Sequence, residues 1–139
     1  MNIELLEKAL ENEDNYNIAK TTTQEIKNKK NDILQKLQLN RDNIKLYHNK
    51  LKDYMYIETI EDLKYGANIR WINLKKFDNI KITNGGVLCD IKPNNNGISL
   101  VIKLYNNIYI NLIFNENLIF QLLNHEEKVI LKAFTLLSK

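Results

Sequence analysis

Glycine and proline are confined to one stretch of this sequence, and their distribution limits where helices and strands can form. All four glycines and the one proline lie between residues 66 and 97 of the 139-residue chain. Residues 22–65 contain neither residue type, so nothing in them interrupts a helix. At about Glu58 the spacing of apolar residues changes from helical to alternating. The sequence therefore predicts an α+β chain with a helical first half followed by a β-rich region.

Two helices are expected in the first half. Apolar residues at helical spacing predict a short amphipathic helix over residues 3–11. Thr22 with Glu25 three residues later has the pattern of a capping box, which predicts the start of a second helix. This second helix is expected to be long, over residues 23–56, because no helix-breaking residue occurs in it.

The long predicted helix carries an apolar stripe spaced by sevens, threes and fours, with Lys30 and Asn40 as its polar members. A helix of roughly 50 Å cannot bury such a stripe alone, so it needs a partner. Three arrangements remain open: a hairpin within the chain, a coiled coil between copies, and a coiled coil with another protein. The possible oligomer interface comprises Ile33, Leu37, Ile44, Tyr47, Leu51 and Tyr54.

A small five-stranded antiparallel barrel of SH3-like plan is expected over about residues 66–121. Short connections between the segments favour antiparallel pairing. Asn84-Gly85 is a type I′ turn signal between two of the segments. The segments of alternating or short apolar pattern are residues 67–73, 80–83, 86–91, 98–104, 108–114 and 118–123, with a possible 3₁₀ turn at 115–117.

A closing helix is expected at the end of the chain. Asn124 with Glu127 three residues later is a helix N-terminal signature, and the residues that follow form one apolar face. We expect this helix to pack across a barrel opening or against the long helix. The predicted domains are a helical region over residues 1–57 and a barrel with its closing helix over 58–139.

The sequence offers little material for catalysis or metal binding. His48, His125 and the single cysteine, Cys89, have no ligand spacing with one another. Cys89 is expected to share the apolar face of its strand with Val87 and Ile91, which makes it an inert core thiol. No serine-histidine-aspartate pattern occurs. We therefore expect a protein that is not an enzyme and that has no metal and no cofactor.

Arg70 and Trp71 are adjacent in the first predicted strand and face opposite sides of it. In one interpretation Trp71 anchors the core while Arg70 pairs with Asp90 or Asp78. In the other, an exposed aromatic ring beside a charge binds a ligand, as small barrels often do. We favour the first interpretation. The sequence "TNGGV" lacks the spacing of a phosphate-binding loop, so a hairpin or a bulge explains it better.

Two functions from different classes remain. The favoured one is a non-catalytic protein-interaction or scaffolding protein, with partners or a second copy bound through the long helix. The alternative is a nucleic-acid-binding module that uses the loop over residues 74–82. The net charge is only +3 and is spread evenly along the chain, which weighs against the alternative. Its possible contact residues are Arg70, Lys75, Lys76, Phe77 and Lys81.

No membrane association is expected, because no apolar run approaches the ~20 residues that a bilayer span requires. The acidic N-terminus lacks the apolar segment of a signal peptide. The single cysteine excludes an intrachain disulfide. These features favour an intracellular location.

Three segments, "YGANIRWINL", "ITNGGVLCDIK" and "LIFQLLNHEEKVILKA", resemble motifs of small uncharacterised proteins from giant, AT-rich DNA viruses of the mimivirus kind. The resemblance covers about residues 60–137. It implies a barrel core preceded by a variable helical region, and a viral, virion-associated protein in the host cytoplasm or virion. The family has no established activity, so the resemblance assigns no functional residue.

Overall fold

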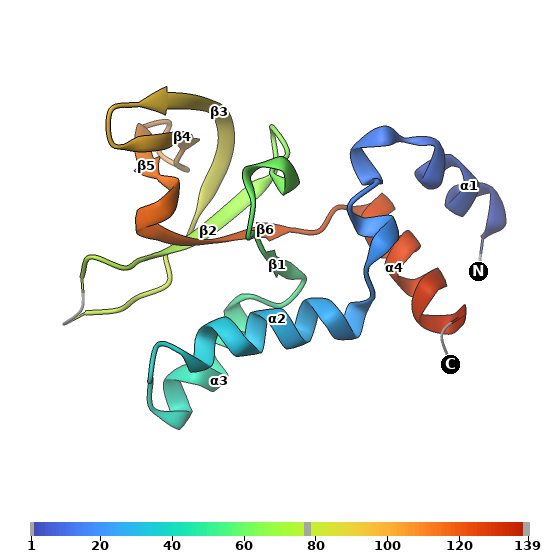
Figure 1. The fold of residues 1–139 in the computed structure, drawn as a ribbon, viewed down its shortest axis with the longest axis horizontal. Coiled ribbons are helices and arrows are strands. Elements are labelled where there is room, and N and C mark those ends of the chain that lie inside the picture. Colours follow the sequence, from blue (N-terminus) through green and yellow to red (C-terminus); the bar gives the residue numbers. More distant parts are fainter. Residues whose placement is uncertain (1, 77–78, 138–139) are drawn as a thin grey trace. The chain divides into compact units, whose positions relative to one another are not determined.

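The computed structural model describes residues 2–76 and 79–137, and these contain four α-helices and a six-stranded antiparallel sheet (Figure 1). The α+β class is therefore confirmed. The chain divides into two compact units, one of Met1–Met55 with Leu123–Lys139 and one of Tyr56–Leu122. The C-terminal helix belongs to the first unit, whereas the sequence-based division grouped it with the strands.

The first unit, here called the helical unit, is built from helices packed around a small apolar core. The core consists of Ala9, Ile18, Ile26, Ile130 and Leu131. The helix expected over residues 3–11 is confirmed as α1. The helices are α1 (Ile3–Glu11), α2 (Thr23–Gln35), α3 (Arg41–Lys50) and α4 (His125–Leu137), with short 3₁₀ turns η1 (Glu13–Asn15) and η2 (Ile18–Lys20).

The single long helix predicted over residues 23–56 is wrong, because the chain turns between α2 and α3. Gln38 adopts a left-handed conformation with φ of 55°, which a helix interior does not allow. Asn40 then caps α3, since its side-chain oxygen accepts a 2.8 Å hydrogen bond from the backbone N–H of Asn43. Asn40 is therefore a helix-capping residue and not a polar member of a coiled-coil stripe.

The predicted apolar stripe is divided between α2, α3 and the residues that follow. Tyr47 and Leu51 are buried inside the chain, and Leu34 beside the stripe is fully buried. The remaining stripe residues are half-buried; they are Ile33, Leu37, Ile44 and Tyr54. Without a continuous helix the stripe offers no coiled-coil seam, while self-association through its half-buried members stays a prediction.

α4 begins where the sequence predicted, at a complete capping box. The Asn124 N–H donates to a carboxylate oxygen of Glu127 at 2.9 Å, and the Glu127 N–H donates to the Asn124 side chain at 2.8 Å. The helix packs against α1 and α2. The closing helix was expected either across a barrel opening or against the helix predicted over residues 23–56. Its packing against α2, which is the first part of that range, matches the second expectation.

The second unit, here called the sheet unit, contains nearly all of the sheet. The predicted five-stranded SH3-like barrel is wrong: the sheet has six strands in the order β1-β6-β2-β3-β4-β5 and does not close. The extra strand, β1, comes from residues expected at the end of the long helix. The strands are β1 (Tyr54–Tyr56), β2 (Asn68–Asn73), β3 (Gly86–Asn94), β4 (Gly97–Lys103), β5 (Tyr109–Ile113) and β6 (Asn117–Leu122); 3₁₀ turns are η3 (Ile60–Asp62) and η4 (Phe114–Glu116).

Asn84-Gly85 forms a bulge and not the predicted type I′ hairpin turn. Ile82 pairs with Ile72, and Gly86 pairs with Ile69, so both sides of the bulge follow the same strand, β2. Gly85 has φ of +90°, and a Cβ on it would lie 2.4 Å from the carbonyl oxygen of Ile69. Only glycine allows this close approach of two backbones.

A second bulge changes the expected environment of Cys89. Leu88 pairs with Ile102 and Asp90 with Val101, which leaves Cys89 without an opposite residue. Cys89 is exposed, so the prediction of a core thiol is wrong. Strict alternation placed Cys89 on one face with Val87 and Ile91. The extra residue turns Ile91 instead to the core face of Leu88, since these two pair with the buried Leu100 and Ile102, and Cys89 stays on the other face.

Candidate functional site

A groove between α2 and α4 is a concave site of the helical unit. Its volume is about 290 Å³. The α2 residues that line it recur at intervals of three and four, and so do those of α4, so each helix contributes one face. The lining residues are Thr23, Ile26, Lys27, Lys30, Asp53, Tyr54, Leu123, Lys128, Leu131, Lys132, Thr135 and Leu136. We refer to this site as the helical groove.

The floor of the helical groove is apolar. Ile26 and Leu131 are buried, and Leu123 and Leu136 extend the apolar surface. Thr135 donates a 3.1 Å hydrogen bond to Thr23, which joins α4 to the start of α2 at one end. Two helical turns of lining residues make the floor about 10 Å long.

Lysines surround this apolar floor. Lys27, Lys128 and Lys132 are exposed at the rim, while Lys30 is buried in the wall. Among the described residues that line the groove, the one acidic residue is Asp53, whose carboxylate lies 3.3 Å from the ammonium of Lys128. Positive charge therefore exceeds negative charge at the groove, although the whole chain is nearly balanced.

Lys30 has an unusual environment for a lysine. Its Nζ atom donates 2.9 Å hydrogen bonds to the carbonyl oxygens of Leu51 and Tyr54. Burial lowers the pKa of Lys30 from its ordinary value of 10.5, Asp53 opposes this shift, and Lys27 adds to it. Lys30 thus holds the segment after α3 against α2 and forms one wall of the groove.

Lys30 was noted in the sequence only as a polar member of the apolar stripe. The signal that could have identified it is its spacing, since it lies four residues from both Ile26 and Leu34, which are buried. A lysine between two buried residues of one helix face must find acceptors inside the protein.

The sheet unit holds a second, more polar pocket beside Trp71. Its volume is about 350 Å³, and Lys76 and Lys81 both line it. Trp71 is buried to 7% exposure, as the favoured interpretation expected. The other lining residues are Asn73, Asn79, Ile82, Thr83 and Asn84.

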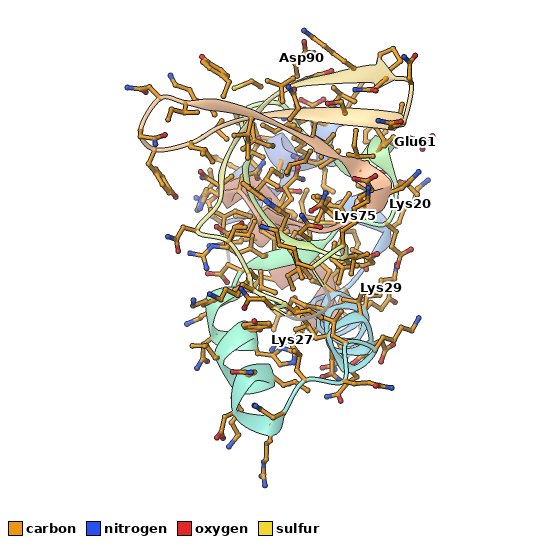
Figure 2. All side chains as sticks on the ribbon, turned by 90° about the vertical axis from the view of Figure 1, so that its left-hand side faces the viewer. Lys20, Lys27, Lys29, Glu61, Lys75 and Asp90 are labelled. Carbon is orange, nitrogen blue, oxygen red and sulfur yellow. The ribbon has the colours of Figure 1, made fainter. Side chains whose placement is uncertain are left out.

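Two of the remaining predicted contact residues, Lys75 and Arg70, do not line this pocket. Lys75 forms a 2.7 Å ion pair with Glu116 (Lys75 is labelled in Figure 2). Arg70 is half-buried in β2, opposite Phe120 of β6, and its side chain leaves the strand on the face opposite to Trp71. Phe77, and Asp78 as a possible partner of Arg70, lie outside the described residues. Of the four predicted contact residues that the structure describes, the pocket therefore gathers Lys76 and Lys81.

The histidines show no metal-site geometry in the described part of the chain. His48 Nε2 lies 3.2 Å from the side-chain oxygen of Asn31, and burial together with the nearby Lys30 lowers the pKa of His48 from 6.5. Over residues 2–76 and 79–137, no three histidine, cysteine or acidic side chains gather where they could hold a metal ion. None of the helices in those ranges is both long and apolar enough to cross a bilayer.

Comparison of the chain with protein-family models, with curated proteins and with solved structures gives no significant match.

Proposed function

We propose that this chain is a non-catalytic protein-interaction module whose helical groove binds the apolar face of an acidic amphipathic helix from a partner protein. The observation that supports the proposal is the combination of an apolar floor with a rim of lysines, within one compact unit. Helix-in-groove recognition uses this arrangement, with apolar anchors in the groove and charges at its edge.

The dimensions of the groove favour a helical ligand. The lining residues extend over two turns of both α2 and α4, and a docked helix presents apolar side chains at matching intervals of three and four residues. A volume of about 290 Å³ accommodates a few such side chains but is at the lower limit of pockets that enclose a drug-sized molecule.

The rim determines the preferred charge of the ligand. Lys27 and Lys132 are exposed and form no ion pair within the part of the chain that the structure describes, whereas Lys128 is already beside Asp53. Acidic residues on the ligand would pair with these ammonium groups at the edge of an apolar contact. Because such pairs are solvent-exposed, they contribute orientation and association rate more than affinity, and salt weakens them.

A peptide-binding measurement tests the proposal. The probe is a fluorescein-labelled synthetic helix with leucines at intervals of three and four and glutamates elsewhere, titrated with the intact protein and followed by anisotropy. We expect binding that weakens with added salt, and no binding of a peptide with the same composition in scrambled order. A matched peptide with lysine in place of glutamate should bind at least about tenfold more weakly, which corresponds to ~1.4 kcal/mol.

Two charge reversals on α2 give a matched pair of variants. Lys27→Glu changes the groove rim, whereas Lys29→Glu changes a residue two positions along α2, which helix geometry puts about 200° around the axis. Figure 2 labels both lysines. Lys27→Glu, alone or with Lys132→Glu, should weaken binding of the acidic peptide, and Lys29→Glu should not. Equal binding by all variants, or preference for the basic peptide, would contradict the proposal.

The resemblance to proteins of giant DNA viruses suggests the class of partner. On that basis we propose a structural protein of the virion as the source of the acidic helix. Affinity capture from infected cells with wild type and with Lys27→Glu/Lys132→Glu tests this part. The proposed partner must be a virion protein with an acidic amphipathic segment, and the double variant must fail to recover it.

Nucleic-acid binding is the second candidate, and the pocket beside Trp71 favours it. Lys76 and Lys81 supply positive charge beside side-chain amides that can hydrogen-bond a base or sugar. Filter binding of single- and double-stranded nucleic acid at two salt concentrations tests this candidate. Micromolar or tighter binding that falls with salt and is lost in Lys76→Glu/Lys81→Glu would support it, whereas the groove variants should leave it unchanged.

A further inference from the structure

β5 is an edge strand whose outer side carries none of the features that usually prevent strand addition. It pairs with β4 and has no other neighbour in the described sheet. None of its five residues is charged or proline, which are the residues that commonly protect edges. Tyr109 is 59% exposed, and Ile108 just before the strand is 55% exposed.

The hairpin geometry shows which backbone groups point outward. Leu104 N–H donates to the carbonyl of Ile108 at 2.8 Å, which makes these residues a hydrogen-bonded pair. Along an antiparallel pair, hydrogen-bonded and non-hydrogen-bonded positions alternate. Tyr109, Asn111 and Ile113 are therefore the β5 residues whose N–H and C=O groups point away from β4.

These outward residues have a symmetric arrangement about Asn111. A second strand with the same sequence, run antiparallel and centred on Asn111, would place Tyr109 opposite Ile113 and Asn111 opposite its own copy. All three outward positions then form hydrogen-bonded pairs. At the positions between them, Ile110 of one copy would lie opposite Leu112 of the other, so apolar side chains pair with apolar side chains. These pairs lie on the sheet face where Ile110 lines a pocket with Trp71.

From this self-complementarity we infer that β5 pairs with β5 of a second copy of this chain, in an antiparallel two-fold arrangement centred on Asn111. The join would unite the two sheets into one continuous sheet. A second copy fits better than an unrelated strand because this register uses every residue of β5 and brings no like charges together. It also brings the exposed Ile108 next to Phe114 of the second copy.

The residue on the two-fold axis provides a sharp test, because it meets its own copy. Asn111→Lys places two positive charges opposite each other in a homodimer, and Asn111→Asp places two negative charges there. Each should weaken dimerisation by about fivefold or more, since like charges directly opposite on paired strands are destabilising. An equimolar mixture of the two variants pairs opposite charges and should restore dimers. The control is Asn95→Lys, the same change at an exposed turn residue outside β5.

Sedimentation equilibrium on the full chain, from ten to several hundred micromolar, measures the effect. We expect dimers for wild type and for Asn95→Lys, weakened dimers for each Asn111 variant alone, and heterodimers in the mixture. Hydrogen exchange gives a second readout, because the Asn111 amide should become protected as wild-type concentration rises. A monomeric wild type, an unaffected Asn111→Lys, or a mixture without heterodimers would each overturn the inference.

Discussion

The Nζ atom of Lys30 on α2 donates a 2.9 Å hydrogen bond to the carbonyl oxygen of Leu51, the C-cap residue of α3. Carbonyl groups at a helix C-terminus lack intrahelical donors, and a lysine there satisfies one and complements the helix dipole. The contact also holds the chain at the point where it enters β1. One side chain thereby connects α2, α3 and the wall of the helical groove.

The first prediction concerns stability at alkaline pH. Burial holds the pKa of Lys30 in the folded chain below 10.5, the ordinary value that applies to the unfolded chain. At pH values between the folded-state pKa and 10.5, the unfolded chain therefore binds more protons than the folded chain. The free energy of unfolding should therefore rise with pH in that window, and fall as pH decreases through it. Lys30→Met keeps the apolar length without the titrating group and should lose this rise.

Urea unfolding of wild type and Lys30→Met at several pH values below 10 measures the difference. Tyr56 titrates with the opposite sign, because burial first and Glu58 second raise its pKa above 10. Its contribution is common to both proteins and cancels in the comparison. A parallel pH dependence for the two proteins would show that Lys30 is not desolvated.

The second prediction concerns mild acid. Burial and the charge of Lys30 lower the pKa of His48 below 6.5, so protonation of His48 is less favourable in the folded chain. Its contribution to stability is present above pH 6.5 and is lost as pH falls through the folded-state value. His48→Asn should reduce the fall in unfolding free energy between pH 7 and pH 5. Two-dimensional NMR of the imidazole should show the lowered pKa directly, and an ordinary titration midpoint would refute the prediction.

The third prediction compares two glycines with positive φ. A Cβ at Gly66 would meet nothing within 4 Å, so Gly66→Ala costs only the left-handed conformation, about 1 to 2 kcal/mol. A Cβ at Gly85 would lie 2.4 Å from the Ile69 carbonyl oxygen. Gly85→Ala should therefore cost on the order of 3 kcal/mol or more, because β2 must move away. Denaturant unfolding checks this order, and equal losses would contradict the bulge geometry.

The fourth prediction concerns the cap of α3. Asn40→Ala removes the acceptor for the Asn43 N–H and should cost about 1 kcal/mol, whereas Asn40→Asp keeps a capping oxygen and should cost little. Thermal unfolding measures both. If Asn40→Ala changed nothing, α2 and α3 would not be separate helices in solution.

Local signals in the sequence predicted individual elements well. The capping residues Thr22 and Asn124 mark the starts of α2 and α4. Five of the six predicted strand segments became strands, whereas residues 80–83 form only an isolated bridge between Ile82 and Ile72. These features depend on residues a few positions apart, which the sequence displays directly. The errors arose where one residue changes the local geometry. Gln38 in a left-handed conformation divides the helix, and the bulges at Gly85 and Cys89 shift the strand register.

The candidate sites depended more on contacts between distant residues. The helical groove joins residues near position 27 to residues near position 132, and no periodicity within either segment indicates that they meet. Lys76 and Lys81 were predicted because both lie in one short basic loop. Lys30 was missed because its acceptors, the carbonyls of Leu51 and Tyr54, belong to backbone that had been predicted as helix interior.

The bulge in β3 provides the chain with a single natural attachment point for probes. Cys89 is the one cysteine of the sequence and its thiol is exposed, so a maleimide reagent would modify this protein at one defined place without any mutation. A nitroxide attached there would report the separation of two sheets joined through β5 as a dipolar coupling between identical labels. The same thiol, left unprotected in air, would link purified molecules covalently, so preparations intended for association measurements require a reductant.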